Sequence, residues 1–468
     1  KIINNEKDEI INMVFSSLAF IFVFLPILLL VYFISPYKYK NIILLIFSIA
    51  FYTLGEPRYI LLIIISMIIN YILSILIYNN NKNKDKKNLL LFTTILLNIA
   101  IMIFFKYYSF IIDNVNIIFN SSLKVIEIPL PLGISFYTFQ LISYIVDVYK
   151  GKVTPQKNLV KFSLYLLMFP QLVAGPIVKY SDIEKQIDYR KINIIKFGQG
   201  VERFIIGLAK KVIIANNLGL IWDEIKLVNI ESLSLFSAWI GIIAFTLQIY
   251  FDFSGYSDMA IGLGKMFGFD FLENFNYPYI SKSITEFWRR WHISLGSWFK
   301  EYLYIPLGGN RSGKLIQFRN IIIVWLTTGL WHGASWNFVV WGLYFGFILY
   351  FEKIFLKKIL EKLPKIICNL YTMIIVIIGW VFFDSNNLTS AVEYIKVMFG
   401  LGNVNYDSLG KYLFSTNILL ILISIVMSTN IINKLIEQIK KTYKSKDLIF
   451  IVFIKTMIFI ISIAYLVS

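Results

Sequence analysis

The stretch Asn320–Phe351, NIIIVWLTTGLWHGASWNFVVWGLYFGFILYF, contains no acidic or basic side chain apart from His332. A helix needs about 20 apolar residues to cross a bilayer, so this stretch is too long for one simple span. Gly329 and Gly333 lie on either side of the histidine and permit a helix break or a close approach of two helices. Along a continuous helix His332 would lie roughly 18 Å from the start, near mid-membrane. An imidazole there is costly without a partner or a polar cavity, so we expect catalysis, with a satisfied structural histidine as the alternative.

The rest of the chain has the same membrane character. Of its 468 residues, 57% are hydrophobic and 16% are charged, whereas soluble proteins average about 25% charged residues. The sequence therefore predicts an all-α polytopic membrane protein with about 11–13 membrane segments, some of them re-entrant or interfacial. Apolar runs of spanning length lie at 14–35, 59–78, 89–105, 233–250, 366–383, 412–428 and 448–468, and shorter or broken runs lie at 41–54, 133–146, 162–178 and 204–222.

Proline and glycine interrupt several of these runs, as in Pro129–Gly133 and Pro170–Pro176. Broken backbone at membrane depth is tolerated only where it is buried in protein or lines a water-filled cavity. A bundle with an internal cavity is therefore expected. Polar residues in or beside the spans favour the same interpretation, although Asp147 and Asp252 equally fit a position at the membrane surface. These residues are Gln140, Asp147, Gln171, Gln248, Asp252 and Asp258.

The positive charges lie mainly in short loops between spans. Lys38 and Lys40, the loop 79–88 and the segment 150–161 are all lysine-bearing, which assigns them to the cytoplasm by the positive-inside rule. The net charge of +17 is explained in this way, so no nucleic-acid partner is expected. The lipid bilayer is the expected surrounding. The biased use of Lys, Asn and Ile indicates an AT-rich bacterial genome, so the expected location is a bacterial cytoplasmic membrane that the chain crosses several times.

Residues 1–12 are expected to form an N-terminal extension, with Met13 as the translational start and 13–468 as one transmembrane domain. The first span has neither a basic leading segment nor a small-residue cleavage site, unlike a signal peptide. Cys368 is the only cysteine and lies in an apolar run, as a packing residue would. With one cysteine and two histidines, no metal site is expected, because closed zinc sites use four nitrogen or sulfur ligands.

The second histidine, His292, follows a helix start. Ser283 is the expected N-cap and Glu286 the partner of a capping box. From there, aromatic and aliphatic residues recur at helical spacing as far as Tyr302, which predicts one amphipathic interfacial helix with His292 at the edge of its aromatic face. His292 could reach a reaction chamber from that position, or it could simply pack among tryptophans.

The window 288–341 holds both histidines, seven of ten tryptophans and four of seven arginines. Lysine is the usual cation of this chain, so clustered guanidinium groups indicate recognition of phosphate or carboxylate. The alternative is an aromatic and basic belt at the membrane surface. Histidine without a metal is suited to proton transfer, most simply general-base activation of a hydroxyl. No serine near the histidines lies in a Gly-x-Ser-x-Gly elbow, so a serine acyl-enzyme is not expected.

At these residues the chain resembles the membrane-bound O-acyltransferase (MBOAT) family, and most closely its alginate and polysaccharide O-acetyltransferase membrane subunits. The resemblance runs from near the start of the chain to about residue 350, with a catalytic core at about 130–350. The matching segments are MVFSS at 13–17, LPLGISFYTFQ at 130–140, PQLVAGP at 170–176, YFDFSGYSD at 250–258, NFNYPYISKSITEFWRRWHISL at 274–295, EYLYIPLGGNR at 301–311 and GLWHGASWN at 329–337.

The resemblance implies a ring of tilted helices around a central cavity, in which an acyl group passes from a cytoplasmic thioester donor toward an acceptor outside. His332 matches the family's catalytic histidine, and His292 matches the second histidine of the bacterial branch. The implied partners are an acyl donor, a polysaccharide acceptor and a separate extracytoplasmic transferase. No bound cofactor is expected. Expected substrate-binding residues are Asn276, Trp288, Arg289, Arg290, Arg311 and Trp331.

The donor is left open between two classes. Acetyl-CoA is favoured by the IPLGGNR segment at 305–311, and its phosphates would meet Arg289, Arg290, Lys300 and Arg311. A D-alanyl carrier protein that supplies teichoic acid is the alternative, and it would need a tunnel and a docking face. A polysaccharide transporter or flippase without enzymatic activity is the alternative from another functional class.

Overall fold

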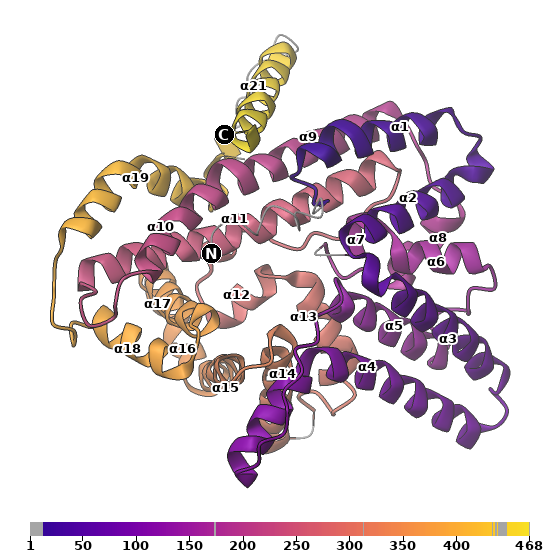
Figure 1. The fold of residues 1–468 in the computed structure, drawn as a ribbon, viewed down its shortest axis with the longest axis horizontal. Coiled ribbons are helices and arrows are strands. Elements are labelled where there is room, and N and C mark those ends of the chain that lie inside the picture. Colours follow the sequence, from indigo (N-terminus) through magenta and orange to yellow (C-terminus); the bar gives the residue numbers. More distant parts are fainter. Residues whose placement is uncertain are drawn as a thin grey trace. The chain divides into compact units, whose positions relative to one another are not determined.

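The computed structural model describes residues 13–172, 175–311, 313–432, 434–435, 438 and 447–467. The expected N-terminal extension, 1–12, lies outside these residues. The described chain divides into two compact units, one built from 13–208, 256–272 and 466–467, the other from 209–255 and 273–465. Figure 1 shows that both units consist of helices. Apart from an isolated bridge between Ser234 and Val404, the described residues form no β-structure, which confirms the all-α expectation.

Helices of the first unit begin with the π-helix η1 and follow the chain to α9. Their bounds are η1 (Phe20–Phe24), α1 (Leu25–Ile34), η2 (Tyr37–Tyr39), α2 (Lys40–Gly55), η3 (Pro57–Tyr59), α3 (Ile60–Asn79), α4 (Lys84–Phe119), α5 (Ile134–Tyr149), α6 (Leu159–Leu167), α7 (Phe169–Leu172), α8 (Tyr180–Asp188) and α9 (Ile194–Ala209).

The long helix α11 (Leu235–Met266) contributes residues to both units. The other helices of the second unit are η4 (Lys210–Ala215), α10 (Asn216–Lys226), η5 (Pro278–Ile280), α12 (Ile284–Arg290), α13 (Ile293–Phe299), η6 (Lys300–Tyr304), α14 (Lys314–His332), α15 (Trp336–Phe351), η7 (Glu352–Leu356), α16 (Lys357–Leu360), α17 (Lys365–Asp384), α18 (Leu388–Met398), α19 (Ser408–Met427) and α21 (Asp447–Val467).

Seven helices among the described residues are long and apolar enough to cross a membrane. They cover Pro57–Asn79, Lys84–Phe119, Ile194–Lys226, Leu235–Met266, Trp336–Leu360, Lys365–Asp384 and Ser408–Met427, and two shorter apolar helices cover Phe20–Ile34 and Val452–Val467. Further apolar runs, at 41–54, 133–146 and 162–178, fold as helices of 16 residues or fewer. Full spans and shorter helices together agree with the expected 11–13 full, tilted or partial segments.

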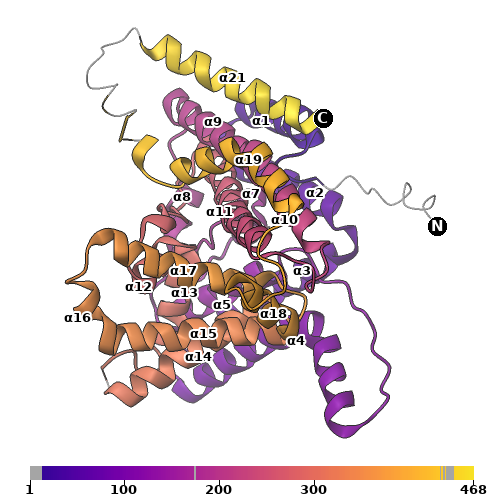
Figure 2. The same ribbon diagram turned by 90° about the vertical axis from the view of Figure 1, so that its left-hand side faces the viewer.

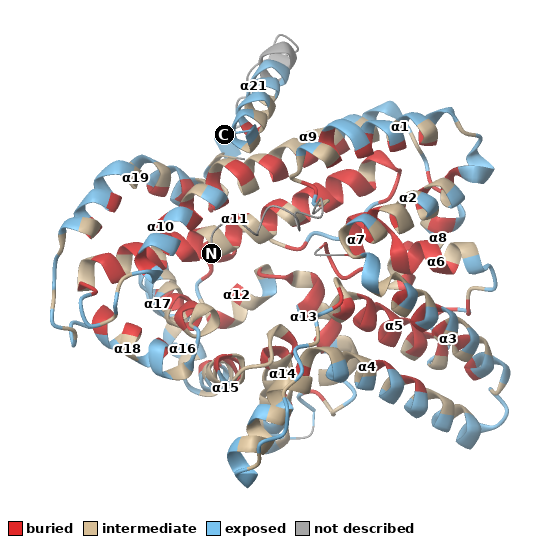
Figure 3. Cartoon of the chain, viewed as in Figure 1, coloured by how far each residue is buried: buried red, intermediate tan, exposed pale blue. Residues whose placement is uncertain are grey.

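Figure 3 colours many residues of α4 and α19 as exposed, and the exposed residues of these two helices include large apolar side chains such as Ile117 and Leu419. The start of α4 is set by Asn83, whose side chain accepts a hydrogen bond from the backbone N–H of Lys86. Asn120 ends α4 in the left-handed conformation that asparagine tolerates. Inside the helix, Asn98 exchanges amide hydrogen bonds with Asn70 of α3 at 2.8 and 3.0 Å. Apolar faces without such partners are suited to lipid contact.

The uncharged stretch 320–351 does not form one helix. α14 ends at His332, and α15 returns beside it, as Figure 2 shows. Gly329 makes this approach possible, because a Cβ at that position would overlap the backbone carbonyl oxygen of Phe338. Gly342 faces the backbone of Trp325 equally closely. The helix break and close approach that the two glycines permit are confirmed, and His332 lies at the turn of a helical hairpin rather than within one continuous helix.

Candidate active site

The helix that precedes His292 begins where the sequence predicts. The Ser283 side chain accepts a hydrogen bond from the backbone N–H of Glu286, which makes Ser283 the N-cap of α12. Glu286 reaches back to the N–H of Lys282, one residue before the position that a capping box uses. The predicted N-cap is confirmed, and the reciprocal half of the box is displaced by one residue.

The single amphipathic helix expected from 284 to 302 is wrong. α12 ends at Arg290, and His292 has a positive φ of 45° before α13 begins at Ile293. The segment around Asn274 replaces the helical hydrogen bonds at this point, since its carbonyl accepts from the N–H of Ile293 at 2.9 Å. His292 is therefore the N-cap of a new helix, and its ring does not lie on a continuous aromatic face.

Asn274 also holds the imidazole of His292. Its Oδ1 accepts from the backbone N–H of Ser294 at 3.2 Å and from the Ser294 hydroxyl at 2.8 Å, and lies 3.1 Å from Nδ1 of His292. Because a backbone N–H can only donate, the atom at the centre is an acceptor, and Nδ1 of His292 carries the proton. The lone pair is then on Nε2, which is buried and has no hydrogen-bond partner among the described residues.

Burial keeps His292 neutral. Its side chain is 3% exposed, and the ring lies edge-on to Phe253 with centroids 4.6 Å apart. This environment lowers the pKa of His292 to about 3, because desolvation disfavours the imidazolium. A neutral imidazole with an unpartnered Nε2 can accept a hydrogen bond from a substrate group, whereas the low pKa makes it a weak proton acceptor.

Both histidines line one cavity of about 520 Å³ within the second unit. His332 is half-buried at the end of α14, with its ring 5.0 Å from the Trp341 ring and 5.1 Å from that of Phe383. The buried Trp331 ring lies 4.9 Å from His332 and 6.2 Å from His292. The tertiary structure thus brings together the two residues that the sequence singled out.

Only some of the predicted substrate-binding residues line the cavity. Trp288, Arg289 and the Lys300 side chain line it. Arg290 does not, because its guanidinium forms an ion pair with Glu286 at 2.9 Å and donates to the carbonyl of Asn276.

Three other residues also lie away from the cavity wall. Asn276 and Arg311 are exposed and do not line the cavity. Trp331 is buried and does not line the cavity, although its ring lies near both histidine rings. Of the residues expected to contact phosphate, Arg289 and Lys300 line the cavity.

The tryptophans near the cavity form a packed cluster. The Trp288 ring lies 4.7 Å from Trp325 and 5.6 Å from Trp341, and Trp291 lies 4.9 Å from Trp380. All these centroid distances are typical of aromatic contacts in protein cores. These tryptophans therefore pack against other rings inside the protein, whereas Trp336 is exposed.

Sequence reasoning missed Glu352, which directly follows the uncharged stretch. Its carboxylate is 3% exposed and accepts from the backbone N–H groups of Ile284 and Thr285 at 2.7 and 2.9 Å. A buried carboxylate is stable at a helix N-terminus, where free N–H groups and the helix dipole compensate its charge. Glu352 thereby positions α12, which carries Trp288 and Arg289 to the cavity. The feature of the sequence that could have revealed Glu352 is its position directly after a long uncharged stretch.

The acidic residues beside the spans form ion pairs. Asp147 is buried 3.7 Å from Lys152, and Asp252 lies 2.5 Å from Lys211. Asp258 pairs with Arg203 at 2.7 Å. These contacts give each carboxylate a structural role, which favours the non-catalytic interpretation of Asp147 and Asp252.

Replacing Asn274 by alanine should lower the rate constant of the reaction at this site by about fivefold, because one lost hydrogen bond to His292 is worth roughly 1 kcal/mol. Asn274→Asp retains the Oδ1 acceptor and should restore part of the rate. Steady-state kinetics on the purified protein measures this rate constant, and the melting temperature of each variant shows whether folding is affected. Equal loss in both variants, with an unchanged melting temperature, would exclude the positioning role.

The fold and site define a helical membrane protein whose two histidines share a cavity. A family model described as "MBOAT, membrane-bound O-acyltransferase family" matches residues 156–391. The chain is 41% identical to "Probable alginate O-acetylase AlgI" of Azotobacter vinelandii, over 85% of this chain and 80% of that protein. It is 37% identical to "Peptidoglycan O-acetyltransferase" of Helicobacter pylori, over 85% of this chain and 82% of that protein. The chain belongs to the membrane-bound O-acyltransferase family and is an O-acyltransferase.

A more distant similarity concerns another acyl group. "Teichoic acid D-alanyltransferase" of Bacillus subtilis is 29% identical over 53% of this chain and 65% of that protein. The acetyl-transferring relatives match more of the chain at higher identity.

Proposed function

We propose that this protein transfers acetyl groups from acetyl-CoA, across a bacterial cytoplasmic membrane, for O-acetylation of a cell-envelope or exported polysaccharide. The observation that carries the proposal is the shared cavity of His292 and His332, which offers proton-accepting nitrogen in a largely apolar site. The names of the relatives supply the acetyl group and the class of acceptor. An extracytoplasmic transferase completes the transfer to the glycan in this proposal.

The chemistry needs one proton acceptor. In the step at this site, His332 takes the proton of the hydroxyl that first receives the acetyl group, as the oxygen of that hydroxyl forms a bond to the thioester carbonyl carbon. The carbon–sulfur bond then breaks, and the imidazolium returns the proton to the departing thiolate. His292 assists by accepting a hydrogen bond at Nε2, the atom left free by its contact with Asn274.

Arg289 and Lys300 are the proposed phosphate contacts of the donor, since they line the cavity. Changing either residue to glutamine should raise the KM for acetyl-CoA by about tenfold, the effect of losing one charge-assisted hydrogen bond. Lys282→Gln is the matched control, because Lys282 is exposed next to α12 and does not line the cavity. Radiolabelled acetyl-CoA supplied to purified protein measures the effect. A KM that rises equally in the control would contradict the assignment.

The same assay distinguishes the rival functions. A D-alanyl carrier protein as donor would transfer labelled alanine while acetyl-CoA remained intact. A transporter or flippase would consume neither thioester, and its transport would survive loss of both histidines. The greater identity to acetyl-transferring relatives favours acetyl-CoA.

A further inference from the structure

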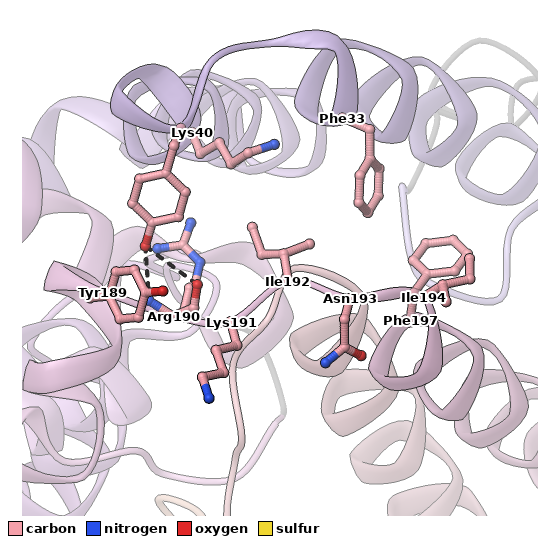
Figure 4. Close-up of a pocket in the computed structure, with 10 residues that line it drawn as sticks. Phe33, Lys40, Tyr189, Arg190, Lys191, Ile192, Asn193, Ile194 and Phe197 are labelled. Carbon is pink, nitrogen blue, oxygen red and sulfur yellow. Dashed lines mark hydrogen bonds between the residues drawn. The ribbon is translucent and has the colours of Figure 1, made fainter.

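A second and larger cavity, of about 860 Å³, lies within the first unit. It forms where the end of α1 and the start of α2 meet the segment between α8 and α9. Figure 4 shows cationic side chains toward one end and apolar side chains toward the other. The lining residues are Phe33, Tyr37, Lys40, Tyr189, Arg190, Lys191, Ile192, Asn193, Ile194 and Phe197.

The cationic end contains two buried charges. Lys40 is 9% exposed and donates to the carbonyl of Tyr32 at 2.6 Å, whereas Arg190 is 4% exposed and donates to neutral oxygens that include Oδ1 of Asn41 at 2.7 Å. No carboxylate lines this cavity among the described residues. The acidic residues nearby, Asp188 and Asp270, pair with lysines outside the cavity. Buried cations without a counter-charge are costly, so this end is suited to an anion.

The apolar end continues into exposed apolar surface. Phe33 near the end of α1 contacts Phe197 edge-on, with ring centroids 5.4 Å apart. Ile194, the first residue of the span Ile194–Lys226, is 80% exposed. The cavity therefore lies at the boundary between apolar helices and a lysine-bearing loop. The positive-inside rule assigns that loop, with Lys38 and Lys40, to the cytoplasm.

We propose that this cavity binds an anionic phospholipid, with the headgroup phosphate beside Lys40, Arg190 and Lys191 and an acyl chain over Phe33, Ile194 and Phe197. Free phosphate and coenzyme A share the phosphate chemistry. The exposed apolar end favours the lipid, because a soluble phosphate would leave that surface without a partner. Cytoplasmic leaflets are also rich in anionic lipid, which attracts basic residues at the membrane surface.

The headgroup contact can be tested at Lys191, which is exposed and can change without disturbing the fold. The full-length protein is reconstituted in nanodiscs of phosphatidylglycerol or phosphatidylcholine, and retained lipid is measured by native mass spectrometry. Lys191→Gln should weaken phosphatidylglycerol retention about fivefold, the effect of one cation near an anionic surface. Lys157→Gln, an exposed lysine outside the cavity, should leave retention unchanged.

The acyl-chain contact is tested by a second pair of matched variants. Ile194→Ser should weaken retention, whereas Ile195→Ser should not, because Ile195 is 71% exposed but does not line the cavity. Equal retention of the two lipids, or identical behaviour within either pair, would overturn the proposal. Displacement of phosphatidylglycerol by added phosphate or coenzyme A would overturn the lipid assignment in favour of a soluble ligand. The measurement needs no acyl transfer, so it is independent of the proposed reaction.

Discussion

Replacing His332 by alanine should lower acyl transfer by about a hundredfold or more, the range that a positioned general base contributes. The imidazole lies on the wall of the cavity, beside Trp341 and Phe383, and offers proton-accepting nitrogen at the turn of the α14–α15 hairpin. In cells, base-labile acetate on the envelope glycan should disappear. With purified protein, transfer of label from the thioester should cease.

A second variant separates catalysis from packing. His332→Phe retains an aromatic ring against the same neighbours but supplies no proton acceptor, so it should be as inactive as the alanine variant. Amounts of protein in the membrane and melting temperatures should stay near those of the wild type. Normal ester content in His332→Phe would show that the ring only fills space, and the assignment of His332 as base would fail.

Replacing Gly329 by alanine should destabilise the protein by about 1–3 kcal/mol, the usual cost of forcing extra volume into a packed contact. A Cβ here meets the carbonyl oxygen of Phe338, and backbone cannot rotate aside as a side chain can. The hairpin would have to separate, which would move His332 away from the cavity wall and also reduce acyl transfer. Thermal unfolding in detergent measures the first effect and the thioester assay the second.

Gly198 provides the matched control. It lies inside α9, and no atom of another part of the protein comes within 4 Å of the place that an alanine methyl group would take. Gly198→Ala should therefore be neutral or stabilising by less than about 1 kcal/mol, since alanine is the better helix former. An equal loss of stability in both variants would mean that close packing of α14 on α15 is not the reason for the glycine at 329.

Much of the architecture could be predicted from local chemistry. A bilayer accepts only backbone that satisfies its own hydrogen bonds, so long apolar runs had to be helices. The N-cap at Ser283 was equally predictable, because the cap uses residues three positions apart. Whether the runs at 41–54 and 133–146 span the membrane was harder to predict, since hydropathy does not show how far a short helix extends across the bilayer.

The details of the site depended on contacts between distant residues. Nothing near His292 in sequence indicates a helix break, because Asn274, eighteen residues earlier, supplies the competing hydrogen bonds. Which basic residues line the cavity could likewise be read only from the tertiary structure. Arg290 is adjacent to Arg289 but is held by Glu286, whereas Lys300, the first residue of η6, lines the cavity.

The sequence by itself determined that this protein is helical and membrane-embedded, and it singled out two histidines as the candidate proton acceptors, because hydropathy and residue type are local properties. The tertiary structure decided that the stretch 320–351 folds back on itself and that His292 and His332 line the same cavity. Those outcomes depend on close backbone contact at Gly329 and on the hydrogen bonds of Asn274. Both are interactions between residues separated along the chain, and their energies exist only after the helices have packed.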